Sequence, residues 1–514
     1  MEYVRDTLTI LLLAFSVSLS PQVLAQDANN TLSVASPING QIASGSVQIW
    51  SFTAVEGQVL SFITHTTSGN LDPKMVIANS QGQLLLGNDD YAYPNNSDSL
   101  LEAITIPRTG NYSITVSGVA NTAGEYELRM LDGFSQTALD DNFNGDLQWK
   151  DANTSSASTF SVKSDNGQLL LAVSGPNTSG IANNPKQTAL TDYYASVKVT
   201  ANGGQDGWVV GITLRQTDAN NYYLLNVNSQ GKWRFSSRQN GTTSVIRDWT
   251  DHPALANTTG NFTLGAMVSG AGFDFFYNGV LFGRISDSSL TKPGTIGLAV
   301  STSSTLTSQT TAHFDDLVVT TPMLDNGKRI VPKEITLGQP AVVTRDLERR
   351  GLIPATGQLS LNVPESFIES ARPGVDRVSL ARGATYRNLA IGTTVSWDAA
   401  SDGLTGCGLV LQSKDDTNYI LAYVDHSGAY GVSQRQDDHF VPGIYAENPA
   451  AAGNKHSLVV ILQNDQLLYY VDGNYSGSMT NTVVEGGVGN AVVNFDPIRT
   501  SCKFTDTWVW NWDN

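Results

Sequence analysis

Two stretches of the sequence carry, at matching positions, the residue types from which sugar-binding surfaces are built. They run from Asp218 to Gln239 and from Asp415 to Gln436, and they align without a gap. An aromatic ring can stack on the apolar face of a pyranose, while amide and charged groups bond to its hydroxyls. We therefore take as candidate ligand-binding residues Tyr222, Asn226, Trp233, Arg238, Tyr419, Tyr423, Tyr430 and Arg435.

The strand period divides each stretch between two faces, because successive side chains of a strand point to opposite sides. The face that includes Tyr223 and Ile420 is dominated by apolar residues, which predicts core. The opposite face mixes aromatic and polar residues and is expected to meet a ligand, extended by Trp233, Tyr430 and the two arginines of the next strand. In the alternative interpretation the rings only pack between strands, and the arginines bridge to Asp218 and Asp415.

Four aspartates near the N-terminus form a candidate calcium site within residues 26–133: Asp72, Asp89, Asp90 and Asp98. A hard cation needs several oxygen ligands on closely spaced loops. The alternative is turn chemistry, in which each carboxylate caps neighbouring backbone amides. No other cofactor is expected.

The sequence offers no catalytic constellation. Its six histidines are scattered without the spacing of a helical zinc site, and neither a Gly-x-Ser-x-Gly nucleophile elbow nor a glycine-rich phosphate loop is present. We therefore assign no catalytic residue and expect no enzyme.

The elements that must position these residues are strands. Gly, Ser, Thr, Asn and Asp are abundant among the 514 residues, and this composition predicts an all-β protein of several domains. A net charge of −17 argues against a nucleic-acid partner, which needs basic surface. The oligomeric state is left open.

The N-terminus resembles a signal peptide. Its apolar run from Leu8 to Leu19 is too short to span a bilayer, and Val23 and Ala25 place small residues where signal peptidase reads. We predict residues 1–25 as the signal peptide and a mature protein that is secreted or at the cell surface, or in the periplasm, without a transmembrane anchor.

Residues 26–133 show short alternating runs between turn clusters, the pattern of a β-sandwich. Leu71-Asp72-Pro73, Asn88-Asp89-Asp90, Gly110-Asn111-Tyr112 and Gly124-Glu125-Tyr126 resemble the bacterial pre-peptidase C-terminal domain. That resemblance implies an accessory module of a secreted bacterial protein, used for attachment or delivery.

Residues 138–322 resemble concanavalin A-like lectin and glucanase jelly rolls, including laminin G-like modules and relatives of 3-keto-disaccharide hydrolases. The resemblance rests on Gly211, Asn221-Tyr222-Tyr223, Asn278-Gly279 and Phe314-Asp315-Asp316, and residues 335–514 repeat the pattern as an internal duplicate. The connection from Thr321 to Pro340 is expected to be exposed, and the charged run from Arg345 to Gly351 a solvated face.

Glucanases on this fold resemble one another in a Glu-x-Asp strand that supplies a carboxylate pair. No glutamate in this chain is followed by aspartate two positions later. We therefore favour a secreted binding protein that recognises an extracellular glycan or another surface polymer. Two alternatives stay open: an enzyme acting on modified disaccharides or glycans, and a structural envelope or matrix protein.

The two cysteines, Cys407 and Cys502, both belong to the last repeat, and for an exported protein we predict a disulfide between them, with two free thiols as the alternative. Aligning the repeats places Val210 opposite Cys407 and Ala312 opposite Cys502. The bridge therefore predicts that Val210 and Ala312 are neighbours on adjacent strands.

Overall fold

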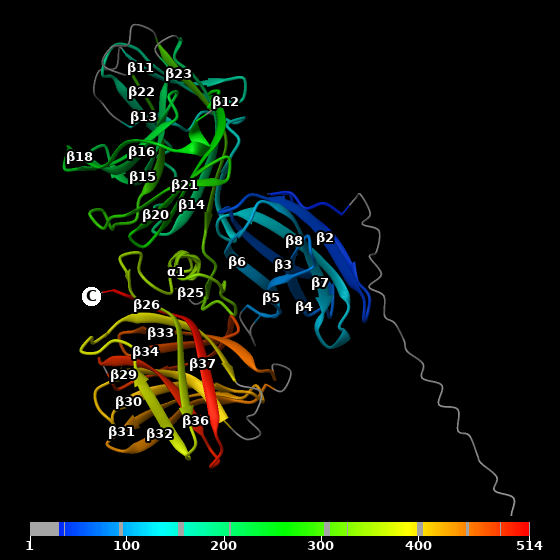
Figure 1. The fold of residues 1–514 in the computed structure, drawn as a ribbon. Coiled ribbons are helices and arrows are strands. Elements are labelled where there is room, and N and C mark those ends of the chain that lie inside the picture. The colour runs from blue at the N-terminus through cyan, green and yellow to red at the C-terminus, as the bar shows by residue number, and fades with distance from the viewer. Residues whose placement is uncertain are drawn as a thin grey trace, which may run out of the picture.

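The computed structural model describes residues 30–512, apart from 35, 92–95, 153–158, 205–206, 257, 303–308, 326, 398–404, 449–451 and 484. The predicted signal peptide lies outside the described residues. Within the described part of the chain, none of the helices combines the length and the apolar character needed to cross a membrane. The chain is all-β, as predicted, and its strands form three β-sandwiches (Figure 1).

The first sandwich packs two four-stranded antiparallel sheets, and ring contacts such as Phe52 with Phe62, 5.0 Å between centroids, fill its core. One sheet has the order β1 (Ile38–Ile42), β8 (Gly124–Asp132), β3 (Val59–Gly69) and β6 (Ser99–Thr105). The other has the order β2 (Val47–Ala54), β7 (Gly110–Gly118), β4 (Pro73–Asn79) and β5 (Leu84–Asn88). A 3₁₀ turn, η1 (Val119–Asn121), precedes β8.

The second sandwich packs a larger pair of sheets. The first has the order β11 (Phe160–Asp165), β12 (Gln168–Val173), β23 (Thr310–Thr321), β14 (Tyr193–Asn202), β19 (Asn261–Ser269), β20 (Gly272–Tyr277) and β21 (Val280–Ser286), with β9 (Gln136–Asp141) also paired to β23. The second has the order β10 (Lys150–Asp151), β13 (Ser179–Asn183), β22 (Thr295–Ser301), β15 (Val209–Asp218), β16 (Asn221–Asn228), β17 (Lys232–Gln239) and β18 (Thr242–Asp251). The 3₁₀ turn η3 (Pro253–Leu255) follows β18.

The third sandwich repeats this arrangement. One sheet has the order β26 (Gln358–Ser370), β37 (Thr500–Asn511), β28 (Leu389–Trp397), β33 (Lys455–Gln463), β34 (Gln466–Val471) and β35 (Asn474–Thr480). The other has the order β27 (Gly374–Ser379), β36 (Gly487–Asn494), β29 (Thr405–Ser413), β30 (Tyr419–Asp425), β31 (Tyr430–Gln436) and β32 (His439–Ala446). Strand for strand, these sheets match β12 to β21 and β13 to β18 of the second sandwich, which is the arrangement that a duplication would produce.

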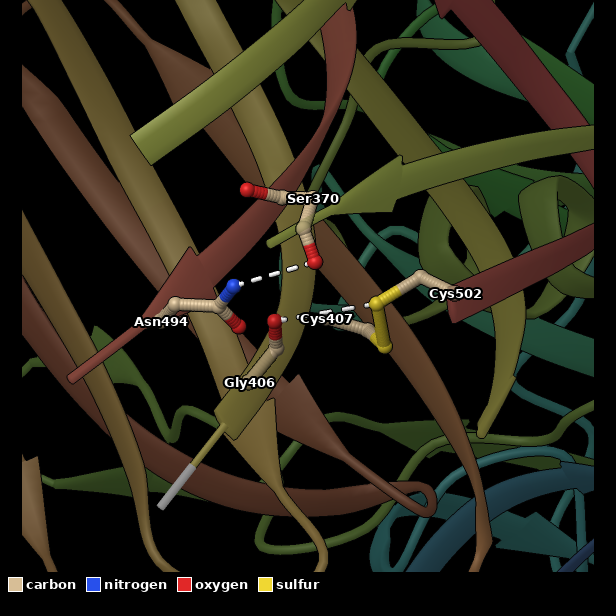
Figure 2. The surroundings of a disulfide bond; sticks show 5 residues. All are labelled: Ser370, Gly406, Cys407, Asn494 and Cys502. Atoms are coloured by element: carbon tan, nitrogen blue, oxygen red, sulfur yellow. Dashed lines mark hydrogen bonds between the residues drawn. A yellow bond between two sulfur atoms is a disulfide. The ribbon is translucent and has the colours of Figure 1, made fainter. Parts of the chain in front are cut away.

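A disulfide joins Cys407 of β29 to Cys502 of β37, with 5.8 Å between the Cα atoms, which confirms the predicted bridge (Figure 2). The two strands belong to the facing sheets of the sandwich. The equivalent residues Val210 and Ala312 likewise lie on facing sheets, in one core cluster. The expectation that they are on adjacent strands is therefore wrong, because the bridge spans the core between the two sheets.

The connection between the second and third sandwiches contains a short hairpin, β24 (Leu324–Asp325) with β25 (Lys328–Arg329), and the helix α1 (Pro340–Arg349). Proline in the first turn suits a helix start, and Val343 and Leu347, one turn apart, face the same apolar cluster. The helix is followed by Gly351, just beyond its C-cap, whose φ of 70° is the left-handed conformation favoured after a helix C-terminus.

Helix α1 lies where all three sandwiches meet (Figure 1). Arg349 is 2% exposed, and its Nε donates to Asp274 Oδ2 of the second sandwich at 2.8 Å. Its Nη1 also donates to Thr105 Oγ1 of the first sandwich. Val343 and Leu347 pack with Tyr470 and other residues of the third. The predicted solvated face is therefore wrong: the charged run is buried because partners from distant parts of the chain surround it.

The rest of the connection is only partly exposed. Leu324 and Val331 are exposed, as expected of a linker, but Glu334 and Ile335 are buried. Ile335 N donates to Gly473 O at 2.8 Å, which joins the segment to the third sandwich. The segment is therefore docked along part of its length.

Candidate functional site

The face of the third sandwich that bears β30 and turns away from the core has the features of a binding surface. Strand pairing sets which side chains share this outer face, because directly opposed residues of antiparallel strands point the same way. Tyr419 pairs with Arg435 and Tyr423 with Gly431, whereas Val424 of the core pairs with Tyr430. Tyr419, Tyr423 and Arg435 therefore share the outer face, and Tyr430 does not.

Four aromatic side chains on and beside this face line a groove of about 390 Å³, which we call the aromatic groove: Tyr423, Phe440, Tyr445 and Phe495. Phe440 is 48% exposed, Tyr445 64% and Phe495 51%, although most aromatic rings in this chain are buried. The remaining wall is largely aliphatic, with Val375, Leu421 and Val493 among its residues. Large exposed rings gathered in one concave place are characteristic of ligand sites rather than of ordinary surface.

The groove is held by contacts behind it. Asn494, which lines the groove next to Phe495, donates from Nδ2 to Ser370 O at 3.3 Å and to Ile498 O at 3.1 Å. Figure 2 shows this amide beside the disulfide of Cys502. The start of the turn that carries Phe495 is therefore tied to the end of β26 and to the far side of the same turn.

Two hydroxyl groups fix the rings on the other side of the groove. Tyr469 of the core donates to the backbone oxygen of Tyr423 at 3.0 Å, which holds β30 at this point. The Tyr445 hydroxyl donates to Glu447 Oε1 at 3.1 Å, and this bond raises the pKa of Tyr445. Burial raises the pKa of Tyr423 as well. The hydroxyl groups of Tyr423 and Tyr445 therefore stay protonated at physiological pH.

Tyr419 has a different role from the groove rings. It is fully buried, and Arg377 and Arg435 lie near its ring at 4.2 and 5.8 Å from the centroid. Cation–π contacts of this kind stabilise the sheet face and leave no ring surface for a sugar. Arg435 is also paired with Asp438.

The second sandwich presents the equivalent outer face on β16 and β17. Tyr222 pairs with Arg238 and Asn226 with Arg234, so these four side chains share one side of the sheet. Tyr222 is buried in a small cluster with Ile181 and Ala299. The face is consequently polar and charged around one covered ring.

Two candidate residues lie on the wrong face for ligand contact. Trp233 pairs with Val227 and is buried in the core against Phe275, with 5.6 Å between ring centroids. Tyr430 likewise packs on the core near Tyr469, 6.2 Å between centroids. The expectation that they extend the outer face is wrong, because the hairpin turns set a register that pairs both with core positions.

The bridges of the alternative interpretation are not formed either. Asp218 accepts hydrogen bonds from Asn220 N and the Asn221 amide, and these bonds lower its pKa. Asp415 accepts in the same way from Thr417 and Asn418. Each carboxylate therefore closes its own turn instead of pairing with an arginine.

Sequence reasoning missed Phe440, Tyr445 and Phe495. Strict alternation along β32 would put residues 440 and 445 on opposite faces. A register shift between Val432 and Ser433 breaks that alternation, so that Phe440 opposes Arg435 and Tyr445 opposes Gly431 on the same outer face. The available signal was limited to Phe440 and Tyr445, which follow the repeated stretch within ten residues.

The four candidate calcium ligands of the first sandwich do not share one environment. Asp98 accepts from Thr66 N at 3.0 Å and contacts His65 Nδ1 at 2.7 Å, so it is engaged elsewhere. Burial raises the pKa of Asp72 and of Asp90, and the charge of Asp89 raises both further. In the described part of the chain no group of three or more acidic, His or Cys residues has metal-site geometry. The calcium site stays a prediction.

Comparisons with known proteins support part of the family resemblance predicted for the first sandwich. A family model described as the bacterial pre-peptidase C-terminal domain matches residues 46–118, which supports the resemblance predicted for that segment. Among solved structures, the pre-peptidase C-terminal domain of a collagenase from Bacillus anthracis is 17% identical, covers 20% of this chain and 92% of its own, and has a TM-score of 0.17. A search of curated proteins found no match.

Two other solved structures are similar over about a third of the chain. The carbohydrate binding module CBM66 from Bacillus subtilis is 19% identical, covering 34% of this chain and 96% of its own with a TM-score of 0.27. The β-glucanase of Bacillus licheniformis is 15% identical, covering 36% and 99% with a TM-score of 0.27. Identities this low do not carry a function from those proteins to this chain.

Proposed function

We propose that this chain is an exported glycan-binding protein that holds its ligand in the aromatic groove of the third sandwich without chemical turnover. The observation that carries the proposal is the set of exposed rings Phe440, Tyr445 and Phe495 around one concavity. Exposed apolar rings gathered in one place mark an interaction site, and a pyranose offers a matching apolar face.

The polar groups at the rim suit a sugar ligand. The Tyr445 and Tyr423 hydroxyls lie beside the apolar floor, where they would meet hydroxyls at the edge of a stacked pyranose. A groove of about 390 Å³ has room for a short oligosaccharide segment and is open enough for a longer chain to continue past it.

The residues of the groove favour binding over hydrolysis. Glycoside hydrolysis needs two carboxylates flanking the scissile bond. Among the described lining residues of the groove, none is aspartate or glutamate. Asp425, close behind, is buried and caps the amides of Ser427 and Ala429 at 2.9 and 3.0 Å.

A glycan array probed with the full chain, followed by product analysis of each bound glycan, tests this proposal. We expect retention of at least one neutral glycan and no shortened product after prolonged incubation. Release of product would establish the enzyme alternative, and the absence of any bound glycan would favour a structural role.

A further inference from the structure

The second and third sandwiches present equivalent outer faces built on the same backbone plan. Asn226 opposes Gly211 and Tyr423 opposes Gly408, so the same glycine position lies beneath both side chains. A Cβ on Gly211 would be 2.5 Å from Asn226 Oδ1, and one on Gly408 would be 2.8 Å from the Tyr423 Cβ atom. In both copies glycine therefore lets the opposing side chain lie over the sheet.

The side chains at equivalent positions of these outer faces differ between the two copies. Gapless alignment of the repeats places Asn226, Thr243 and Asp248 of the second copy at the positions of the groove rings Tyr423, Phe440 and Tyr445. Arg234 stands at the position of Gly431. Three positions that are aromatic in the third sandwich are therefore polar in the second, which also has an additional arginine on this face.

Arg238 of the second copy is not paired with a carboxylate as its counterpart Arg435 is in the third. Arg435 is paired with Asp438, whereas Gly241 occupies the equivalent position beside Arg238. Arg238 Nη1 donates to Thr243 Oγ1 at 3.3 Å, but its Nε has no hydrogen-bond partner among the described residues. Among the described residues, Arg238 forms no ion pair with a carboxylate.

Two further polar atoms on this face are also without partners. Within the described chain, neither Arg234 Nε nor Asn226 Oδ1 has a hydrogen bond, although both atoms are covered. Arg234 Nε lies 3.7 Å from Asp248, which is 80% exposed, and such an exposed pair contributes little. A ligand cannot reach these covered atoms directly, but the side chains of Arg234 and Arg238 are only partly covered, so their guanidinium groups can still meet one.

We propose that this face, formed by Asn226, Arg234 and Arg238, binds the carboxylate groups of an acidic glycan, such as a polymer of uronic acids. A guanidinium group binds a carboxylate through paired, charge-assisted hydrogen bonds. The inference rests on the proposed function, in which these outer faces bind glycans, and it assigns the two copies to different ligands.

Affinity electrophoresis of the full chain through gels containing polygalacturonate tests the inference, with neutral dextran gels as the reference. Because the chain carries a net charge of −17, non-specific adsorption to a polyanion is disfavoured, so retention reports a local contact. We expect Arg234→Gln and Arg238→Gln each to weaken retention about tenfold. Arg238→Lys keeps the charge but loses the paired geometry, so it should fall between wild type and Arg238→Gln.

The control is Lys163→Gln, which removes an exposed positive charge from the opposite sheet of the same sandwich and should leave retention unchanged. Wild type that migrates freely, or arginine variants that are retained like wild type while melting normally, would overturn the inference. Tyr445→Ala should not affect polygalacturonate retention. Its effect on neutral glycans therefore tests the proposed function separately.

Discussion

The disulfide of the third sandwich can be removed by copying the residues of the second. The double variant Cys407→Val with Cys502→Ala introduces the pair found at Val210 and Ala312, both of which are fully buried in an equivalent core. The bridge closes a loop with a sequence separation of 95. The chain-entropy model assigns such a loop about 4 to 5 kcal/mol, so we expect the free energy of unfolding of the third sandwich to fall by that amount.

Hydrogen exchange at increasing urea concentrations, read peptide by peptide, distinguishes the third sandwich from the second within the intact chain. Peptides from β29 and β37 should lose protection at lower urea in the variant, and peptides from β15 and β23 should not change. Wild type treated with a reductant should behave like the variant. A loss below about 1 kcal/mol would refute the loop-closure reasoning.

Three further predictions concern the core and the junction. Val210→Cys with Ala312→Cys should form a disulfide between the facing sheets of the second sandwich, detected as a loss of free thiols and a higher melting temperature; persistent thiols would contradict the equivalence of the copies. Arg349→Ala leaves Asp274 buried without its main partner and should cost about 3 to 5 kcal/mol in urea unfolding, whereas exposed Arg129→Ala should cost little. Burial raises the pKa of Glu334 from 4.5 to about 8, so the folded state keeps a proton that the unfolded chain releases. Stability should therefore fall as pH rises from about 4.5 to 8, and Glu334→Gln should flatten this dependence of the melting temperature; an unchanged slope would contradict it.

Strand periodicity was sufficient to predict the all-β fold and the core face of the repeated stretch. Tyr223 and Ile420 are fully buried as that pattern requires. The same rule failed for Trp233 and Tyr430 because the turn between two strands, and not the period within one, decides which residues are opposed.

The junction could not be predicted from local sequence. The charged run around Arg349 has the composition of a surface, and its partners Asp274 and Thr105 are far away in the chain. Val343 and Leu347, one helical turn apart, were the local sign of a docked helix. The aromatic groove was hidden for a related reason, since Phe495 reaches it from a separate turn and Tyr445 through a register shift.

Isothermal titration with a neutral glycan that the full chain binds tests the central claim most directly. Tyr445→Ala removes a 64% exposed ring from the groove, and Phe367→Ala removes a 57% exposed ring from β26 on the opposite sheet. Loss of a stacking ring costs about 1 kcal/mol or more, so Tyr445→Ala should weaken binding by about fivefold or more with an unchanged melting temperature. Phe367→Ala should bind like wild type. Equal affinities for all three proteins would contradict the assignment of the aromatic groove as the ligand site.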